Sequence, residues 1–329
     1  MENVMSEITK PVSGNLQTGV VMDPIEDIKT YKDSSFAMLL EAQRRGHEIF
    51  YMEPGDLFVK DGRVFASMQK LVVRDNTTDW FSLTPLGNHA LDELDVILMR
   101  RDPPFDMNYI YATYMLELVE NAGTLVINRP QSLRDANEKF FISRFPQCCV
   151  PMMISSESGR LRDFVEQHGR CVVKPLDGMG GESIFQVSSD DMNMNVILET
   201  ITRHNTRPVM VQTYIDEISQ GDKRILMVDG EPVPYALARF AGAGDFRGNL
   251  AKGGSSKGVP LSERDRWICS QVAPELKRRG ILFAGLDVIG DWLSEVNVTS
   301  PTCIRELDKE FGLNIAGQLF DAAEAKLKR

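Results

Sequence analysis

The sequence has few cysteines, no excess of basic residues and no long apolar run. None of its apolar stretches approaches the roughly 20 residues that cross a bilayer. The formal net charge of the 329 residues is -10, which disfavours a long track for nucleic acid or for an anionic membrane surface. Five cysteines without CxxC spacing argue against a disulfide framework and a structural zinc site. Residues 1–17 carry acids and a proline where a signal peptide needs apolar residues, so we expect a flexible tail on a cytoplasmic protein.

Several familiar site motifs are absent as well. No GxGxxG follows a strand, which disfavours a dinucleotide site of the usual kind. The four histidines (His47, His89, His168 and His204) show no HExxH spacing. We therefore expect any catalysis to rest on groups other than histidine.

The order of apolar segments predicts an α/β protein. From Thr18, apolar strands alternate with amphipathic segments, which predicts a parallel sheet covered by helices in a Rossmann-like N-terminal domain. SLRDANEKFFISRF is expected to form one helix. Beyond it, short apolar runs such as CVVKP, ESIFQV and AGLDVIGDWLSEVNV are joined by turns, which predicts antiparallel sheet.

The stretch VVKPLDGMGGESIFQV places a lysine before a glycine cluster between two strands. A P-loop has its lysine after the glycines and leads into a helix, so this stretch is not a P-loop. A glycine turn between strands can instead cover a triphosphate, with N–H groups from Gly180 and Gly181 and a charge from Lys174. A plain hairpin turn with an extended lysine is the alternative.

The stretch GLDVIGDWLSEVNVTSPT contains a candidate metal site. Glu295 and Asn297 are two residues apart on a predicted strand and so share a face. If residues 290–292 form a three-residue hairpin loop, Asp287 lies opposite Glu295 on that face. Two carboxylates and an amide oxygen suit Mg²⁺ held between protein and phosphates. A two-residue turn would place Asp287 on the other face, and a solvated polar face is the alternative.

Further candidates are weaker when each is taken alone. Lys139, Arg224, Arg239 and Arg305 are cations that could meet an anionic ligand, or they could be ordinary surface residues. Residues 241–258 are rich in glycine, which is typical of a mobile lid over a reactive intermediate and equally of a linker. KDSSF places Asp33, Ser34 and Ser35 at a helix start, where they could hold a substrate or simply cap the helix.

Together these motifs resemble those of ATP-grasp carboxylate-amine ligases. KDSSFAMLLEAQRRG, DVILMRRDPPFD, PQSLRDANEK, KPLDGMGG, RGNLAKGG and EVNVTSPTCIRE closely resemble the bacterial type of glutathione synthetase, and the resemblance covers nearly the whole chain from Thr18. Residues 76–90 match poorly, and Arg101 stands where a lysine is common.

The resemblance implies a domain order and a reaction. After a tail over 1–17, an N-terminal α/β substrate-side domain would span 18–136 and an ATP-grasp region 137–329, with lobes over 137–215 and 216–329 and a lid over 241–258. ATP would lie between antiparallel sheets. γ-Glutamylcysteine would be phosphorylated on its cysteinyl carboxylate, and glycine would attack the acyl phosphate to give glutathione, ADP and phosphate. A cytoplasmic homotetramer is implied as well.

The resemblance also implies roles for individual residues. Arg224 and Arg239 would stabilise the transferred phosphoryl group or the oxyanion, and Asp287, Glu295 and Asn297 would hold Mg²⁺ or Mn²⁺. ATP would contact Lys139, Lys174, Gly180, Gly181, Gln212, Tyr214, Ile215 and Asp222. The peptide pocket would contain Asp33, Ser34, Ser35, Arg100, Asn128 and Arg305.

Two other functions stay open at this point. The ATP-binding half alone would fit another ligase, such as a D-alanine:D-alanine ligase or a glutamate-adding enzyme. A nucleotide-binding regulatory protein that kept the fold and lost turnover is the second alternative.

Overall fold

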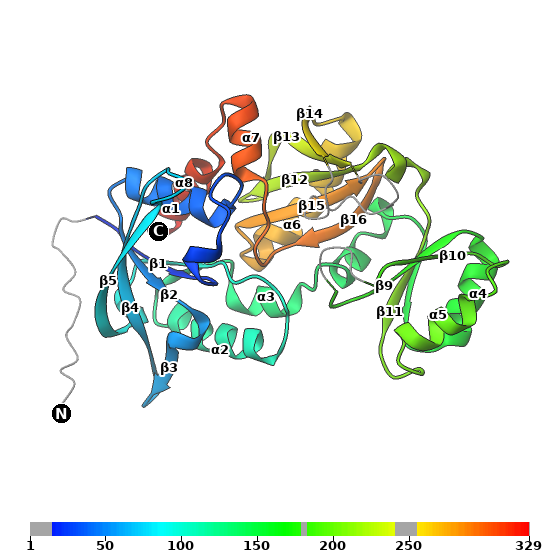
Figure 1. The fold of residues 1–329 in the computed structure, drawn as a ribbon, viewed down its shortest axis with the longest axis horizontal. Helices are drawn as coiled ribbons and strands as arrows, with labels where there is room; N and C mark the ends of the chain where they lie inside the picture. Colours follow the sequence, from blue (N-terminus) through cyan, green and yellow to red (C-terminus); the bar gives the residue numbers. More distant parts are fainter. Residues whose placement is uncertain (1–14, 179–182, 241–254, 329) are drawn as a thin grey trace.

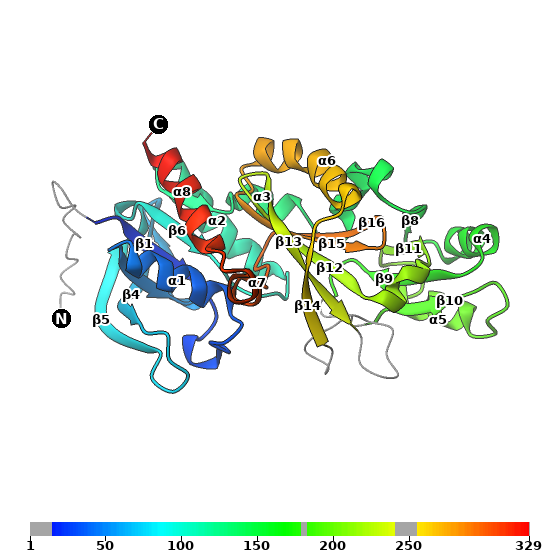
Figure 2. The ribbon, with the colours of Figure 1, turned by 90° about the horizontal axis from the view of Figure 1, so that it is seen from above.

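The computed structural model describes residues 15–178, 183–240 and 255–328. Three sheets follow one another along the long axis of the molecule (Figure 1). The N-terminal sheet lies at one end, a small four-stranded sheet lies at the other, and a five-stranded sheet lies between them (Figure 2). No described helix is both long and apolar enough to span a membrane.

The N-terminal sheet has seven strands in the order β3-β4-β2-β1-β6-β7, with β5 paired to β4. β1 pairs in parallel with β2 and β6, and β6 with β7, which confirms the predicted parallel sheet. β4 pairs antiparallel with β2, β3 and β5, an extension that the sequence pattern did not predict. The strands are β1 Gln17–Val21, β2 Glu48–Met52, β3 Leu57–Lys60, β4 Arg63–Val73, β5 Phe81–Ala90, β6 Val96–Met99 and β7 Leu125–Ile127.

Three helices belong to this part of the chain: α1 Ser34–Arg44, α2 Met107–Asn121 and α3 Pro130–Asp135. The single helix expected for SLRDANEKFFISRF is wrong, because α3 ends at Asp135 and a 3₁₀ helix over Phe140–Arg144 follows. The side chain of Asn137 accepts hydrogen bonds from the N–H groups of Lys139 (3.2 Å) and Phe140 (2.9 Å). Such local bonds compete with a continuous helix.

The small sheet is antiparallel, with the strand order β10-β9-β11-β8. Leu161, Phe164 and Val165 of α4 pack with Leu198 and Ile201 of α5 in a core of their own. Helices and strands here are β8 Met152–Ser155, α4 Ser158–His168, β9 Cys171–Pro175, β10 Phe185–Val187, α5 Met194–Ile201 and β11 Val209–Thr213. A strand follows the glycine cluster, as predicted.

The central sheet is also antiparallel, in the order β14-β13-β12-β15-β16. Its strands are β12 Asp222–Val228, β13 Glu231–Phe240, β14 Ser255–Pro260, β15 Phe283–Ile289 and β16 Trp292–Asn297. Helix α6 (Glu263–Arg279) covers one face, starts with a capping box between Ser262 and Asp265 and ends at a left-handed Gly280. The remaining 3₁₀ helices are Ile25–Asp27, Pro54–Asp56, Leu91–Glu93, Pro146–Cys148 and Asp216–Gln220.

The C-terminal helices return to the N-terminal sheet. α7 (Ile304–Phe311) and α8 (Ile315–Leu327) are separated by a left-handed Gly312. Ile315 and Phe320 of α8 share a core with Phe36 and Leu39 of α1. The last helices therefore pack on the N-terminal α/β region as well as on the central sheet.

Candidate functional site

A pocket of about 620 Å³ lies between the small and central sheets and extends to the start of α1. At one end it is lined by the apolar side chains of Val172, Ile184, Ile215 and Ile218, which we call the apolar end. The other end is lined mostly by carboxylates, and we call it the acidic end. Its charged side chains are those of Asp23, Asp27, Lys29, Lys32, Asp33, Asp102 and Glu306. Charged residues of the central sheet lie between the two.

The centre of the pocket is built by one face of the central sheet. Arg224 of β12 is paired with Asp287 of β15, and Asp287 is paired with Glu295 of β16. These three residues form a row across neighbouring strands, which we call the central row. Asn297 lies two residues after Glu295 and therefore on the same face. A side chain on Gly285, opposite Asn297, would come within 2.8 Å of Arg224, so glycine leaves space for the arginine.

The hairpin differs from the expected one and still brings the predicted metal ligands together. Ile289 pairs with Trp292, which makes a two-residue turn rather than the expected three-residue loop. A bulge at Ser294 then shifts the register, because Val288 pairs with Leu293 and Asp287 with Glu295. The extra residue restores the shared face that a regular two-residue hairpin would have lost.

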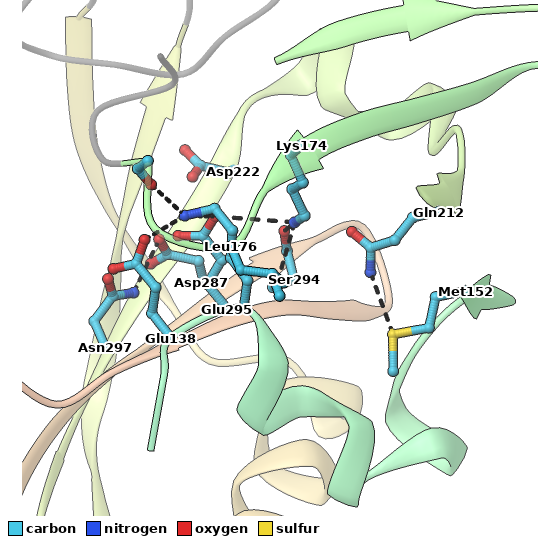
Figure 3. Close-up of polar contacts among 12 residues, drawn as sticks. Glu138, Met152, Lys174, Leu176, Gln212, Asp222, Asp287, Ser294, Glu295 and Asn297 are labelled. Atoms are coloured by element: carbon cyan, nitrogen blue, oxygen red, sulfur yellow. Dashed lines mark hydrogen bonds and ion pairs between the residues drawn. The ribbon is translucent and has the colours of Figure 1, made fainter. Parts of the chain in front are cut away.

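Two buried lysines face the central row, as Figure 3 shows for Lys174. Nζ of Lys174 lies 3.4 Å from both Oγ and the carbonyl oxygen of Ser294 and 3.9 Å from Oε1 of Glu295. Burial lowers the pKa of Lys174. Nζ of Lys139 lies 3.6 Å from Oε1 of Glu295 and donates to the carbonyl of Gly178 at 2.5 Å and to the carboxylate of Glu138.

The charge of Lys139 is set by opposing effects. Burial acts to lower its pKa, but the charges of Glu295 and Glu138 outweigh burial, so the pKa is raised. Burial raises the pKa of Glu138, and the negative charge of Glu295 adds to this. A ligand with more negative charge than a carboxylate, such as a phosphate group, could replace Glu138 and Glu295 as the partner of the lysines.

Two arginines hold the carboxylate of Asp287. Arg224 donates from Nε to Oδ1 at 2.5 Å and from a terminal nitrogen to Oδ2 at 2.9 Å, and Arg239 lies 3.0 Å from Oδ2. Burial alone would raise the pKa of Asp287, but the two guanidinium charges outweigh burial and hold this pKa well below its usual range. Arg239 also pairs with Asp222, so the predicted ribose ligand is engaged by an arginine.

The predicted adenine-side residues line the apolar end. Gln212, Tyr214 and Ile215 all border the pocket. The amide of Gln212 has a weak contact of 3.9 Å to the sulfur of Met152, also visible in Figure 3. The ring of Tyr214 lies under the guanidinium of Arg170, whose central carbon is 4.1 Å from the ring centroid.

Most of the residues predicted for the peptide pocket do not line it. Asp33 does, and its Oδ1 also caps α1 by accepting the N–H of Phe36 at 2.6 Å. Ser34 accepts the N–H of Ile304 at 3.1 Å, and Ser35 accepts a bond from Nε of buried Arg100 at 2.9 Å. These contacts join α1 to neighbouring segments and do not border the pocket.

Two of the predicted peptide-pocket residues, Asn128 and Arg305, bind other parts of the protein and do not line the pocket. The amide of buried Asn128 donates to the carbonyls of Phe283 and Val298 at 2.7 Å and accepts the N–H groups of Leu282 (2.8 Å) and Phe283 (2.9 Å). It thus binds the N-terminal region to the central sheet. Arg305 is the first-turn arginine of α7, and its guanidinium pairs with exposed Asp75 at 2.8 Å rather than entering the pocket.

Sequence reasoning missed several residues that line the pocket: Asp23, Lys32, Glu138, Ser294 and Glu306. Glu138 was detectable as the neighbour of Lys139. Ser294 could be found only through the bulge, because regular alternation would put it on the opposite face from Glu295. Gly180 and Gly181 lie outside the described residues, as do residues 241–254 of the expected lid; residues 255–258 belong to strand β14.

Comparison with known proteins agrees with this architecture. Sequence models match the prokaryotic glutathione synthetase N-terminal domain over residues 16–134 and the prokaryotic glutathione synthetase ATP-grasp domain over residues 138–312. The chain belongs to the prokaryotic glutathione synthetase family. The glutathione synthetase of Pseudomonas syringae pv. tomato is 56% identical over 314 residues, covering 95% of this chain and 98% of the relative. That of Vibrio cholerae is 53% identical over 313 residues, with the same coverage.

Membership of this glutathione synthetase family makes the chain an ATP-dependent ligase with an ATP-grasp fold. Solved structures agree on the fold at low identity. A D-cycloserine synthetase aligns with a TM-score of 0.65 at 16% identity, covering 94% of this chain and 99% of that chain. An ATP-grasp ligase complexed with a precursor peptide aligns with a TM-score of 0.60 at 17% identity, covering 96% and 99%.

The family generally uses a divalent cation with ATP, and the donors of the central sheet fit one. No group of three or more His, Cys, Asp or Glu side chains within the described ranges forms a metal site by itself. Asp287, Glu295 and the amide of Asn297 do lie on one face and offer hard oxygen donors, the type that Mg²⁺ prefers. A bound cation would compete with Arg224 and Arg239 for Asp287.

Proposed function

We propose that the protein joins γ-glutamylcysteine to glycine, with ATP converted to ADP and phosphate and an acyl phosphate as the intermediate. The proposal rests on one observation. The central row of Arg224, Asp287 and Glu295 faces buried Lys139 and Lys174, so opposite charges converge between an apolar end and an acidic end of one pocket. Phosphoryl transfer needs this type of positioned charge more than it needs a strong base.

The residues then take the following roles. The apolar end, with Gln212 to Ile215, receives the adenine of ATP, and Asp222 is the candidate for the ribose hydroxyls. Lys139 and Lys174 bind phosphate oxygens. Each lysine thereby replaces the nearby carboxylate of Glu295 with a phosphate group, which carries more negative charge. Asp287, Glu295 and Asn297 would hold Mg²⁺ or Mn²⁺, which would neutralise phosphate charge when bound.

The chemistry proceeds in two steps at the centre of the pocket. A cysteinyl carboxylate oxygen attacks the γ-phosphorus, and the bond to the β-bridging oxygen breaks to release ADP. The amine of glycine then attacks the carboxyl carbon, and phosphate leaves with the oxygen that came from the carboxylate. Arg224 and Arg239 stabilise the phosphoryl group or the tetrahedral oxyanion.

The assembly and the metal are part of the proposal. Family resemblance supports a homotetramer, which light scattering of the purified protein tests directly. Activity with Mg²⁺ and with Mn²⁺, each added to metal-stripped protein, tests the cation. The domain limits at residues 136 and 137 can be tested by limited proteolysis.

Phosphate release by the purified protein tests the reaction. With Mg-ATP we expect release to require both γ-glutamylcysteine and glycine, and glutathione to be the product. Release with D-alanine alone would move the assignment to a D-alanine:D-alanine type of ligase. ATP binding without release under any condition would contradict the proposal and favour a regulatory protein.

A further inference from the structure

Helix α2, at the outer margin of the N-terminal part (Figure 1), has an exposed face without charge. All residues of α2 are described, and its exposed side chains are those of Met107, Asn108, Tyr111, Tyr114, Leu118 and Asn121. Helix α6 differs, because charged side chains such as Glu263, Arg266 and Lys277 are exposed along it. The outer face of an amphipathic helix is normally charged or polar, so contact with water alone does not account for the outer face of α2.

Four large side chains form a continuous stripe along this face, which we call the α2 stripe. Met107, Tyr111, Tyr114 and Leu118 are each 45 to 55% exposed. They are separated by four, three and four residues, a spacing that keeps them on one side of a helix, and the stripe is about 16 Å long at about 1.5 Å per residue. The opposite side of α2 is buried in the core. The helix therefore carries apolar side chains on two sides.

The two tyrosines of the α2 stripe are held in place by their neighbours. The ring centroids of Tyr111 and Tyr114 are 6.4 Å apart. The guanidinium of Arg134 lies over the ring of Tyr114, with its central carbon 4.7 Å from the centroid, and it also donates to Glu117 at 2.6 Å. Side chains that are ordered before binding lose less entropy when a partner covers them. The α2 stripe thus has two features of a protein interface, ordered side chains and exposed tyrosines.

The spacing of the α2 stripe is complementary to a second copy of itself. The intervals of four, three and four residues are the same in both directions along the helix. A two-fold axis at the midpoint therefore brings Met107 against Leu118 of the second copy, and Tyr111 against Tyr114 of the second copy. A two-fold interface is formed by the same surface on both copies. The two helices are antiparallel in this arrangement, which is also the favourable orientation of their dipoles.

The charges at the two ends of the α2 stripe agree with the antiparallel arrangement. At the start of α2, a terminal nitrogen of Arg101 lies 3.8 Å from Oδ1 of Asp106. At the end of α2, Nε of Arg129 lies 3.4 Å from Oε1 of Glu120. The two-fold axis places the first pair of one copy near the second pair of the other. Because each pair has one cation and one anion, no excess of like charge opposes association.

The exposed area of the α2 stripe is close to what an interface between two copies needs. Covering the exposed half of four large side chains on each copy removes on the order of 800 Å² from water, since a large aromatic side chain buries about 150 to 250 Å² when fully covered. The flanking residues Asn108, Asn121 and Arg134 add to this area. Specific interfaces bury roughly 1,200 Å² or more in total.

We infer that the α2 stripe binds the α2 stripe of a second copy of this chain, with the two helices antiparallel about a two-fold axis. The inference does not depend on the proposed reaction. It assigns a surface to the proposed homotetramer, because a tetramer built on two-fold axes needs at least two different interfaces of this type. One of them is then formed by α2.

A charge placed in the α2 stripe tests the interface. We expect light scattering of Leu118→Glu to give half the mass of the wild type, because the interface would bury two unpaired carboxylates. The control Val196→Glu changes an apolar side chain of α5 that is 62% exposed, and it should keep the wild-type mass. Circular dichroism of all three proteins should agree. An unchanged mass in Leu118→Glu would overturn the inference, and so would a monomeric wild type, whose α2 stripe would then bind a different protein.

Added cysteines test the direction of the two helices. The five native cysteines are buried, so mild oxidation reports on the added ones. Met107→Cys combined with Leu118→Cys should give a disulfide-linked dimer on a non-reducing gel, because the two positions meet across the axis. Neither single variant should link, since equal positions of the two helices lie about 16 Å apart along the axis. Linkage in a single variant, or none in the double variant, would overturn the antiparallel arrangement.

Discussion

The two ends of the pocket differ in the type of side chain that they offer to a ligand. The apolar end offers Val172, Ile184 and Ile218, which can enclose a flat ring with little dependence on charge. The acidic end offers Asp33, Glu306 and Lys32, whose charges favour a ligand with a matching charge pattern. Under the proposed function, the apolar end and the central row serve ATP, and the charges at the acidic end are expected to select the peptide.

The largest expected effect comes from the central row. Glu295→Gln keeps the size of the side chain but removes the charge that faces Lys139 and Lys174 and that would help to hold the proposed metal. We expect kcat to fall by at least about 100-fold, because electrostatic contacts of this type contribute that much to transition-state stabilisation. Steady-state assays at saturating ATP would measure it, with Glu263→Gln as the matched control. Activity within a few-fold of wild type would place the reacting centre elsewhere.

Lys174→Met tests whether Lys174, which lies at the boundary with the apolar end, serves activity or stability. The buried ammonium has a lowered pKa because of burial, so replacing it with an apolar side chain should leave the melting temperature unchanged or raised. Activity should fall by about 30-fold, since one phosphate contact is lost. A variant that melts earlier and keeps its activity would indicate a structural lysine.

Asn128→Ala tests whether a predicted substrate ligand is structural. Its amide serves four buried main-chain groups, so the variant should lose about 3 kcal/mol of stability. Below its melting temperature the KM for γ-glutamylcysteine should remain that of the wild type. Chemical denaturation and kinetics of one preparation would measure both, and a raised KM with normal stability would restore Asn128 to the peptide pocket.

The smallest effect concerns a second acid on α7. Burial raises the pKa of Asp308 from 3.8 to about 6, which favours the protonated form in the folded state. The contribution of Asp308 to the free energy of unfolding is therefore largest below about pH 4 and is lost as the pH rises to about 6. Asp308→Asn should flatten that slope and add about 1 kcal/mol at pH 7, a value reduced for partial exposure.

Melting curves between pH 4 and 8 would measure this difference. The KM values for ATP and for γ-glutamylcysteine should not change in Asp308→Asn, because Asp308 does not line the pocket. An unchanged pH slope would show that Asp308 ionises normally in the folded protein.

The sequence was most informative where strand periodicity applies. Alternation placed Glu295 and Asn297 on one face, and the motif resemblance predicted the ATP-grasp fold. The bulge at Ser294 could not be predicted, because hairpin register depends on how Leu293 and Val288 pack together in the core. The role of the serines at the start of α1 could not be predicted either. Ser34 and Ser35 can contact a ligand or a neighbouring segment, and only tertiary packing decides which of the two they contact.

The most direct test of the central claim follows an oxygen atom. γ-Glutamylcysteine labelled with ¹⁸O in its cysteinyl carboxylate would be converted with ATP and glycine, and the released phosphate would be analysed by mass spectrometry. The acyl phosphate route predicts one ¹⁸O atom in each phosphate formed from fully labelled substrate. Phosphate without ¹⁸O would show that the carboxylate is not phosphorylated and would contradict the account.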